Sequence, residues 1–403
     1  MRPIPRRQIQ LCPGVLGEVV RCLRRGTVGQ GPEIARFEAA MAGRLGVRQA
    51  IGVASARVGL RLVADAVGLH PGDAVLCSAY TFHAMPQALR AVGLTPVFVD
   101  TDPDTWTLDP AALEAVDAPR VRALLVTHLF GQPCAMEPIT AWAQRRGVAL
   151  LEDCAHALGA TVAGRSVGTF GTAGLFSFGA GKALPCCGGG LITTNDDDLA
   201  ARIRAAIARG TPPATGLLLA EVAKTAALAW GTSRGGFALV GYPALRAGEA
   251  LRPGLVDRLM QEAPRAVNDS VPRGLALANL QAAVGLRQLP LLDGWLRARQ
   301  AHAEGLDQAL AGLVGLQRPA VVPGTASAWL YYRVLVNDRA RFRRALLRAG
   351  VDTKPDDMTN CGGPDYPVAA RVARTSVELP TDPSLTGDDL RAVAAAVRQA
   401  LAI

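Results

Sequence analysis

The chain has 403 residues, of which 50% are hydrophobic and 19% are charged, and its formal net charge is +9. This length and composition exclude a disordered protein and suit two globular domains, each with its own core. An anionic substrate, a nucleic acid or a membrane surface could each use the positive charge. Because the arginines are scattered along helical stretches without interleaved aromatic residues, we interpret them as solvated helix faces.

Targeting signals are not evident. Residues 1–7 carry arginines, but no apolar signal-peptide core follows them. The most apolar stretch, 217–230, contains Glu221 and Lys224 and is too short to span a bilayer. We therefore expect a soluble cytoplasmic protein with no membrane contact and no nucleic-acid partner.

Short β-rich runs alternate with helix-period segments over the first half of the chain. Strands are predicted at 49–55, 74–79, 96–100, 121–128, 148–153, 174–178 and 191–195. Helices are predicted between several of them, at 59–67, 84–92 and 139–146. Strands that are apolar on both faces and separated by helices predict an α/β fold with a mostly parallel sheet.

This alternation ends after residue 209. An apolar, Pro- and Gly-punctuated insertion occupies about 211–263, and helical periodicity resumes from 275 to 310. A smaller α/β unit follows, with a strand at 329–336 and helices at 340–349 and 388–401. We therefore predict a large domain over 1–265 and a small C-terminal domain over 266–403.

Ligands of such sheets bind beyond the carboxyl ends of the strands. Ser55, His128, Asp153 and Ser177 fall at these positions. Lys182 follows the strand that ends near Ser177, 29 positions after Asp153. An amine and a carboxylate at the ends of two buried strands are what a pyridoxal phosphate enzyme requires, because the amine forms an imine with the cofactor and the carboxylate keeps the pyridine nitrogen protonated.

The eight cysteines form no Cys-x-x-Cys pair and no set at zinc spacing. We expect buried free thiols and no metal site. Cys186 and Cys187 follow Lys182 closely, and exposure of this pair in the active site is the alternative.

Several ordered segments resemble the DegT/DnrJ/StrS sugar aminotransferases, a fold-type-I pyridoxal phosphate family. The segments, which span most of the chain, are Gly-Pro-Glu-Ile-Ala-Arg-Phe-Glu at 31–38, Tyr-Thr-Phe at 80–82, Pro-Val-Phe-Val-Asp at 96–100, His-Leu-Phe-Gly at 128–131, Glu-Asp-Cys-Ala-His-Ala at 152–157, Gly-Thr-Phe-Gly at 168–171, Phe-Ser-Phe at 176–178, Lys182, and Asn-Leu-Gln-Ala-Ala-Val-Gly-Leu at 279–286. The resemblance implies a large domain with a seven-stranded sheet, a pyridoxal 5'-phosphate cofactor and a homodimer with active sites at the subunit boundary.

The resemblance also implies roles for individual residues. Phe82 would stack on the cofactor ring, and Ser177 would bind the cofactor phosphate. Ala56 and Arg57 replace the family's Gly-Thr phosphate loop, where backbone amides at a helix start receive the anion. His156 replaces the family's usual glutamine and would donate a hydrogen bond to the phenolic oxygen of the cofactor. For Phe82, Ser177, Arg57 and His156, a purely structural or outward-facing position is the alternative.

Two departures from the family pattern concern the substrate. The family's Asn-x-Arg, which reaches the neighbouring subunit's site, aligns with Gly274 and Ala276, and nearby Asn268 or Arg273 would have to replace that contact. The segment after Lys182 reads Ala-Leu-Pro-Cys-Cys-Gly-Gly-Gly. We interpret these changes as a rewritten substrate-recognition shell around intact cofactor chemistry.

The resulting functional hypothesis is an aminotransferase. It would move an amino group from an amino acid, with glutamate as the expected donor, to a keto-sugar carried by a nucleotide, in secondary-metabolite or cell-surface sugar biosynthesis. One alternative is a pyridoxal phosphate enzyme of the same fold that acts on a cyclitol, an antibiotic precursor or an amino acid. The other is a cofactor-binding regulator without catalysis. The insertion at 211–263 would cover a dimer interface or the site entrance, or touch a membrane.

Overall fold

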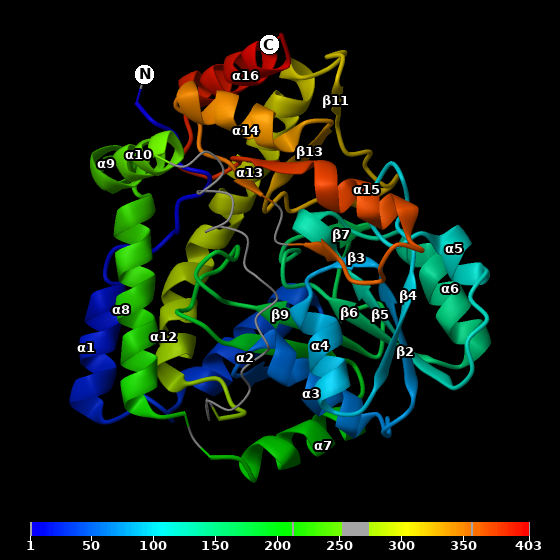
Figure 1. Ribbon diagram of the computed structural model, residues 1–403. Helices are drawn as coiled ribbons and strands as arrows, with labels where there is room; N and C mark the ends of the chain where they lie inside the picture. The colour runs from blue at the N-terminus through cyan, green and yellow to red at the C-terminus, as the bar shows by residue number, and fades with distance from the viewer. Residues whose placement is uncertain (1, 212, 252–273, 356–357, 403) are drawn as a thin grey trace.

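A large sheet forms the centre of the molecule, and a smaller sheet packs above it (Figure 1). The computed structural model describes residues 2–211, 213–251, 274–355 and 358–402. The large sheet has seven strands in the order β1-β10-β9-β6-β5-β2-β4. In chain order they are β1 (Gln49–Val53), β2 (Ala74–Ser78), β4 (Thr95–Val99), β5 (Val121–Thr127), β6 (Ala149–Asp153), β9 (Ala173–Ser177) and β10 (Gly190–Thr194).

The strand prediction is confirmed, with bounds shifted by two residues or fewer. β4, β2, β5, β6 and β9 are mutually parallel, whereas β10 pairs antiparallel with both β9 and β1. The connection from β9 to β10, residues 178–189, contains no crossover helix, and β10 returns antiparallel beside β9. The α/β class and the mostly parallel seven-stranded sheet are therefore as expected.

Both faces of the sheet are buried, and strand alternation decides which helix each side chain meets. Val75 and Cys77 of β2 pack with α3 (Ala56–Ala66), α4 (Ala84–Ala91) and α7 (Asp197–Ala208). Leu76, between them, packs on the opposite face with α6 (Met136–Arg146). Continuous apolar strands are therefore satisfied by helices on both sides.

The remaining helices surround this sheet or support the smaller one. They are α1 (Val15–Arg25), α2 (Glu33–Leu45), α5 (Pro110–Glu114), η1 (Leu129–Gly131), α8 (Thr215–Thr232), α9 (Arg234–Gly236), η2 (Phe237–Gly241), α10 (Tyr242–Leu251), α12 (Asn279–Gln288), η3 (Leu289–Leu291) and α13 (Leu292–Ala309). The helix predicted from 275 begins only at Asn279, because residues 275–277 run beside β1 and Ala276 bridges to Val53.

A four-stranded sheet in the order β11-β13-β16-β14 forms the smaller unit. Its strands are β11 (Leu316–Gln317), β13 (Tyr332–Val336), β14 (Lys354–Pro355) and β16 (Ser376–Leu379), and α14 (Arg339–Arg348), α15 (Pro367–Thr375) and α16 (Gly387–Ala402) accompany them. Two small sheets complete the fold. One has three strands in the order β12 (Thr325–Ala326), β7 (Thr161–Val162) and β8 (Arg165–Ser166), and the other pairs β15 (Thr359–Asn360) with β3 (Tyr80–Thr81). The domain boundary near 265 lies outside the described residues and stays a prediction.

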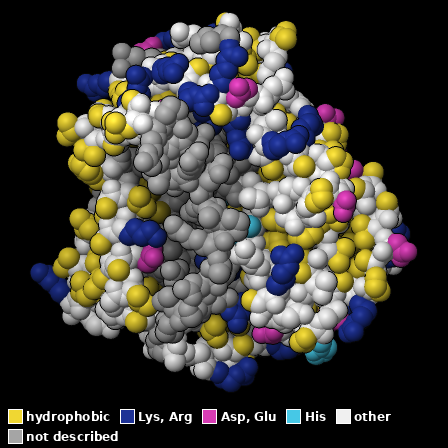
Figure 2. All heavy atoms as spheres, in the orientation of Figure 1, with side chains coloured by type: hydrophobic (Ala, Val, Ile, Leu, Met, Phe, Trp, Pro, Cys, Tyr) yellow, Lys and Arg dark blue, Asp and Glu magenta, His cyan; other side chains and the backbone are white. Residues whose placement is uncertain are grey.

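An apolar face lies over α1, α8 and α10, on the left of Figures 1 and 2. Val19 and Cys22 of α1 and Val222 of α8 belong to one buried cluster that also contains Leu280 and Val284 of α12. The large apolar side chains that they and the adjoining η2 and α10 leave exposed are Leu16, Val20, Leu23, Leu217, Leu228, Trp230, Leu239, Val240 and Leu251. Within the described part of the chain, no helix combines the length and the apolarity needed to cross a bilayer.

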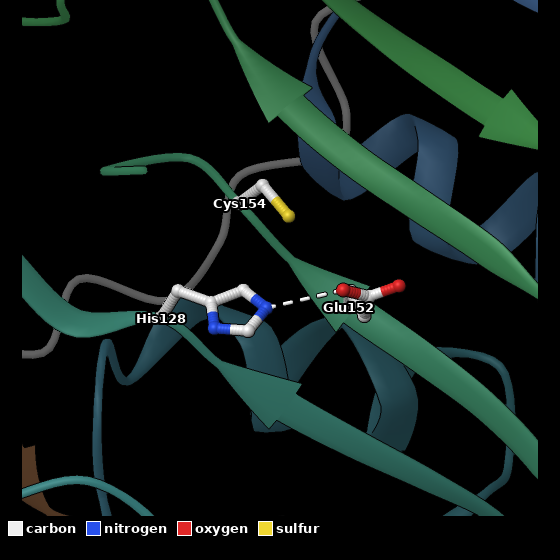
Figure 3. Close-up of side chains that lie close together, drawn as sticks. All are labelled: His128, Glu152 and Cys154. Carbon is white, nitrogen blue, oxygen red and sulfur yellow. Dashed lines mark hydrogen bonds and ion pairs between the residues drawn. The ribbon is translucent and has the colours of Figure 1, made fainter. Parts of the chain in front are cut away.

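A buried carboxylate ties the end of β6 to the following loop. Glu152 accepts hydrogen bonds from the backbone N–H groups of Gly168, Phe170 and Gly171, at 2.7, 2.7 and 2.8 Å. Its Oε2 also lies 3.3 Å from Nε2 of His128 (Figure 3). Because Nδ1 of His128 accepts the Cys134 N–H, we infer that Nε2 carries the proton and donates it to Glu152.

His128, Glu152 and Cys154 place potential ligand atoms within 4.8 Å of one another. However, both oxygens of Glu152 already accept backbone N–H groups. The Cys154 thiol is also held in its neutral form, because burial raises its pKa to about 12. These three side chains therefore stabilise the ends of β5 and β6, and we do not interpret them as a metal site.

We expect Glu152→Gln to destabilise the fold by about 2–4 kcal/mol, because an amide NH₂ would replace an oxygen that accepts buried N–H groups. Urea unfolding monitored by circular dichroism measures this change. Glu114→Gln, at an exposed carboxylate on α5 that pairs with Arg145, is the matched control and should change stability by about 0.5 kcal/mol or less. Equal losses of stability in the two variants would contradict the structural role of the Glu152 carboxylate.

Candidate active site

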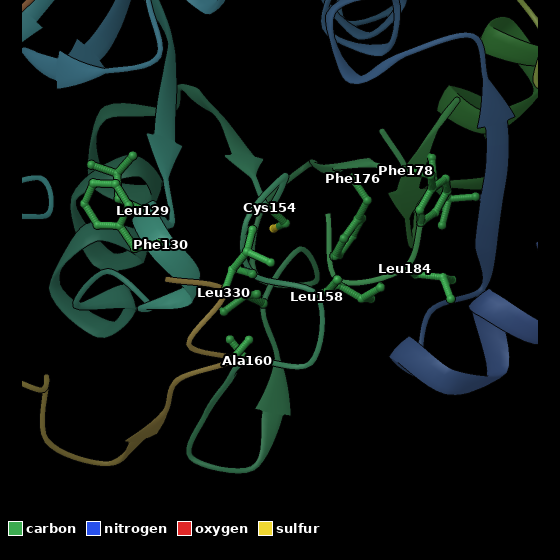
Figure 4. Close-up of a cluster of buried hydrophobic side chains, with 14 of the residues drawn as sticks. Leu129, Phe130, Cys154, Leu158, Ala160, Phe176, Phe178, Leu184 and Leu330 are labelled. Atoms are coloured by element: carbon green, nitrogen blue, oxygen red, sulfur yellow. The ribbon is translucent and has the colours of Figure 1, made fainter. Parts of the chain in front are cut away.

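Lys182 lies on the loop that joins β9 to β10. The loop is closed by hydrogen bonds from Phe178 N–H to Gly189 O (3.0 Å) and from Cys186 N–H to Phe178 O (2.9 Å). Phe178 and Leu184 are fully buried in the core beneath the loop (Figure 4). The packed ends of the loop thus fix the position of Lys182, whose own side chain is half-buried.

Asp153 is the last residue of β6 and is 3% exposed. One donor reaches its carboxylate from the described residues, the Ala155 N–H at 3.0 Å. Burial raises the pKa of the Asp153 carboxyl, and the Ala155 N–H and the charge of Lys182 partly offset that shift. A carboxylate buried with so few donors is suited to receive a cation.

His156 follows three residues after Asp153 and is fixed by its neighbours. Its Nδ1 accepts the backbone N–H of Phe130 at 3.4 Å, and its ring stacks on the ring of Phe130 and meets that of Tyr331 edge-on. Because Nδ1 is an acceptor, the neutral ring carries its proton on Nε2.

The charge around His156 agrees with a neutral ring. Burial lowers the pKa of His156 well below its usual value, and nearby cations lower it further. These cations are Lys182, Arg333, Arg7 and Lys354. His156, the residue predicted to donate a hydrogen bond to the cofactor, therefore stays neutral and carries its proton on Nε2.

The start of α3 lies next to the end of β9. Gly190 pairs with Val53 on one side and with Ser177 on the other, which brings the start of α3 next to the end of β9. A Cβ on Gly190 would lie only 2.7 Å from the backbone nitrogen of Ala56. The absence of a side chain at Gly190 therefore lets the helix start approach Ser177.

The residues predicted to bind the cofactor phosphate lie at the start of α3 and at the end of β9. Ser55 caps α3 by accepting the Val58 N–H at 3.2 Å, and Ala56 and Arg57 follow at the positive end of the helix dipole. The Arg57 side chain is half-buried. The Ser177 hydroxyl faces the Lys182 loop, because a Cβ on Gly179 would lie 4.0 Å from both Ser177 Oγ and Lys182 Cγ.

Phe82 lies between β3 and α4 and is half-buried against the same core. The preceding residue, Thr81, contacts Thr127 at the end of β5 through their hydroxyls at 3.2 Å. His128 N–H in turn donates to Asp153 O at 3.0 Å. Phe82 therefore lies at the edge of the sheet that carries Asp153, although stacking on a cofactor stays a prediction.

Cys186 and Cys187 are both buried, at 0% and 1% exposure, so the alternative of an exposed pair in the site is wrong. Burial raises the pKa of Cys187 to about 11, which keeps the thiol protonated. Cys187 adopts a left-handed backbone (φ 58°), and Gln281 holds its carbonyl oxygen at 3.1 Å. The rewritten segment therefore turns its cysteines into the core.

Sequence reasoning missed a charged cluster beside the loop. Arg333 on β13 is buried, its guanidinium lies 4.1 Å from the ring centre of Phe130, and it pairs with Glu378 at 3.5 Å. Arg7 also pairs with Glu378 at 3.5 Å, and Tyr331 donates from its hydroxyl to Gly181 O at 3.1 Å. An arginine in the middle of the apolar run 329–336 was the one local signal.

The segment that aligns with the family's Asn-x-Arg lies along β1. Leu277 N–H donates to Gly52 O at 3.2 Å, and Ala54 N–H donates to Leu275 O at 2.9 Å. Gly274 and Ala276 supply no charge there. Asn268 and Arg273, the expected replacements, lie outside the described residues.

Comparison with known proteins agrees with this geometry. The sequence model of the DegT/DnrJ/EryC1/StrS aminotransferase family matches residues 14–222 and 254–398, which leaves part of the insertion unmatched. The chain is 31% identical to a GDP-perosamine synthase of Caulobacter vibrioides, over 92% of this chain and 91% of that protein. It is 32% identical to a dTDP-3-amino-3,4,6-trideoxy-alpha-D-glucose transaminase of Streptomyces venezuelae, over 83% and 75%.

A solved structure is similar over nearly the whole chain. It is that of S. venezuelae DesV in complex with a ketimine intermediate, with a TM-score of 0.74 and 30% identity. The alignment covers 96% of this chain and 93% of that one.

We expect His156→Gln, the residue usual in the family, to make stability less dependent on pH. Because the folded pKa of His156 lies below its unfolded value, the unfolded state binds an extra proton as pH falls below about 6.5, and stability is lost in that direction. Between pH 7.5 and 5.5 the wild-type protein should lose about 1 kcal/mol more unfolding free energy than the variant.

Urea titrations of the two proteins at both pH values measure this difference. His302→Gln, on α13, is the control. This variant keeps His156, so it should also keep the pH dependence of stability that His156 contributes. Identical pH dependence of the wild type and His156→Gln would show that His156 takes up a proton in the folded state.

Proposed function

The chain belongs to the DegT/DnrJ/EryC1/StrS aminotransferase family, and we propose that it transfers an amino group from glutamate to a keto-sugar carried by a nucleoside diphosphate. The family and the relatives described above are aminotransferases, and two of them are named for GDP- and dTDP-linked sugars. The observation that carries the proposal is the position of three side chains beyond the strand ends: Lys182 on the closed loop after β9, buried Asp153 at the end of β6, and His156 with Nδ1 occupied by the Phe130 N–H.

The family is pyridoxal phosphate dependent, and the side chains at this edge fit that cofactor. Asp153 offers a buried carboxylate to a protonated ring nitrogen. His156 offers its Nε2–H to the phenolic oxygen, and the start of α3 with Ser177 offers donors to a phosphate. Phe82 would supply an apolar ring face.

When bound, pyridoxal phosphate supplies a ring that accepts the electron pair released as a substrate carbon loses its proton. Lys182 Nζ would take that proton and later return it, because the closed loop holds this residue beyond the end of β9. Asp153 holds the proton on the ring nitrogen through charge, which keeps the ring electron-poor. His156 orients the ring without exchanging a proton, since its pKa is lowered well below neutrality.

We also propose that the enzyme is a homodimer in which a second copy covers the apolar face of α1, α8 and α10. The exposed apolar side chains of that face, among them Trp230 and Leu239, would be costly to leave in water. This use of the described part of the insertion is preferred to membrane contact.

The two relatives described above, which are named for nucleotide-linked sugars, do not favour the alternative functions. A screen of candidate ketones distinguishes a nucleotide-linked substrate from a substrate without a nucleotide. A regulator without catalysis would bind the cofactor but convert no donor.

The proposal is tested by the two half-reactions. Addition of L-glutamate to the purified, cofactor-loaded enzyme should bleach its visible absorbance, and a nucleotide-linked keto-sugar should then restore it and yield an amino-sugar by mass spectrometry. Lys182→Ala should lower the rate of bleaching by about 10³-fold or more. Lys224→Ala, at an exposed lysine on α8, is the matched control and should react like the wild type.

Restoration by a free cyclitol ketone but by no nucleotide-linked sugar would contradict the proposed substrate class. Loaded wild-type enzyme that no amino acid bleaches would contradict transamination.

We expect Asp153→Asn to lower turnover by about 10²–10³-fold with little loss of stability, because a neutral amide cannot hold charge at the ring nitrogen. Steady-state turnover and urea unfolding measure the two effects. Asp73→Asn changes another buried aspartate, which precedes β2 at the opposite end of the sheet, and should leave turnover within about threefold of wild type. Near-normal turnover of Asp153→Asn would refute its assigned role.

A further inference from the structure

The segment 185–187, which follows Lys182 on the loop between β9 and β10, lies against one face of α12. Gln281, Gly285 and Gln288 share this face, because they are spaced four and then three residues apart. The contacts, in order along the helix, are Gln281 with Cys187, Gly285 with Cys186, and Gln288 with Pro185. The helix and the segment therefore run in opposite directions and meet residue by residue.

Two buried amides on this face hold backbone oxygens of the segment. Gln281 Nε2 donates to the carbonyl oxygen of Cys187 at 3.1 Å, and Gln288 Nε2 donates to that of Pro185. The two glutamines are 8% and 0% exposed, and Pro185 and Cys187 are buried as well. Because an unpaired carbonyl oxygen is costly in a buried place, these bonds hold the segment against α12.

The orientation of both amides is fixed from their other side. Gln281 Oε1 accepts the Ala278 N–H at 3.1 Å, and Gln288 Oε1 accepts the Cys12 N–H at 3.1 Å. Since each amide oxygen accepts a backbone N–H, each amide nitrogen faces the segment as a donor. Neither amide can rotate without losing a hydrogen bond, so the two glutamines connect α12 rigidly to the segment.

Glycines allow this close approach. A Cβ on Gly285 would lie 3.0 Å from Sγ of Cys186, and a Cβ on Gly188 would lie 2.8 Å from Nε2 of Gln281. Gly188 also has a φ of 104°, a backbone conformation that favours glycine. The absence of side chains at these two positions therefore gives the helix and the loop the space in which they meet.

The segment also closes the loop around Lys182. The Lys182 N–H donates to Gly179 O at 3.0 Å, which forms a tight turn, and Pro185 follows three positions later. The Cys186 N–H then donates to Phe178 O at 2.9 Å, which ties the segment back to the residue after β9. A shift of the segment would therefore move Lys182.

We propose that Gln288 and Gln281 are positioning residues, which hold Lys182 in place for its proton transfer. The inference rests on the proposed function. A catalytic group has to be held within about 0.5 Å of its productive geometry, and here the hydrogen bonds lead from the loop to a buried helix. Gln288 has the larger share, because its partner Pro185 lies closer to Lys182 in the chain. The two glutamines act on the chemical step and not on substrate binding.

Gln288→Met tests the proposal, because methionine keeps the length of glutamine but cannot donate to Pro185 O. In single-turnover bleaching of the cofactor-loaded enzyme by L-glutamate, this variant should lower the limiting rate constant by about 10–100-fold. The half-saturating glutamate concentration should stay within about threefold of wild type, since Gln288 is fully buried. Gln281→Met should act in the same direction, and it decides the matter if Gln288→Met does not fold.

Thr194→Val is the matched control. The Thr194 hydroxyl, like the Gln288 amide, is buried, donates to a backbone oxygen (Thr172 O, 2.8 Å) and accepts a backbone N–H (Asp196, 3.1 Å). Thr194 lies at the end of β10 that is remote from the loop. Valine removes both bonds, so stability should fall, but the rate constant of bleaching should stay within about threefold of wild type.

A second variant separates the donor from the shape of the side chain. In Gln288→Glu, a protonated carboxyl can donate to Pro185 O and still accept the Cys12 N–H, whereas a carboxylate cannot donate. Burial favours the protonated form, so the rate constant at about pH 6 should lie within about threefold of wild type and should fall relative to wild type as pH rises. A ratio that stays low at this pH would overturn the assignment.

A further readout needs no bound cofactor. Hydrogen–deuterium exchange of the peptide 178–189 should become at least about 10-fold faster in Gln288→Met than in wild type, because the N–H groups of Phe178 and Cys186 close this loop. Exchange of the peptide that covers β5 should be unchanged, since this strand lies at the centre of the sheet.

Gln288→Met with a wild-type rate constant, or with unchanged exchange of 178–189, would overturn the assignment while leaving the proposed function intact. An equal loss of rate in Thr194→Val would also overturn it, because the loss would then follow from general stability. Wild-type enzyme that no amino acid bleaches is a distinct result, which contradicts the proposed function. In that case the exchange of 178–189 still decides whether α12 holds the loop.

Discussion

The active site depends on the different surroundings of two consecutive carboxylates at the end of β6, those of Glu152 and Asp153. Side chains of adjacent strand residues point to opposite faces, so Glu152 and Asp153 meet different surroundings. Glu152 meets three backbone N–H groups and His128, which satisfy its charge and fix the loop at 168–171. Asp153 meets one N–H group and the field of Lys182. The first carboxylate stabilises the fold, and we propose that the second stabilises a bound cation.

Positive charge dominates the other side of the site. Lys182, Arg7 and Arg333 all lower the pKa of His156, and burial does so first. A neutral histidine with its proton on Nε2 is therefore the form that this environment favours, and we propose that it takes the place of the glutamine usual in the family. The same field favours anionic substrates.

Much of the fold and the reactive pair could be predicted from the sequence, because the information is local. Strands that are apolar on both faces identify a mostly parallel sheet, and strand ends converge at one edge. Asp153 and Ser177 lie at such ends, and Lys182 lies on the loop that follows Ser177. The antiparallel course of β10 and the burial of Cys187 were not apparent, since each depends on how a short connection turns through left-handed residues.

The charged cluster could not be predicted because its members are far apart in the chain. Arg7 and Glu378 are separated by 371 positions, and no local pattern marks Arg7 within the N-terminal arm. Arg333 gave a weak signal as a charge in an apolar strand. Contacts across a subunit boundary are likewise invisible to local reasoning, so the consequences of Gly274 and Ala276 stay predictions.

The central claim, that Lys182 is the residue that holds the cofactor, is open to a direct measurement. The chain contains three lysines, Lys182, Lys224 and Lys354. Borohydride reduction of the cofactor-loaded enzyme, followed by proteolysis and mass spectrometry, identifies the lysine that bears the cofactor. We predict the adduct on Lys182 alone. An adduct on Lys354, whose charge also reaches His156, or on none of the three, would contradict the account.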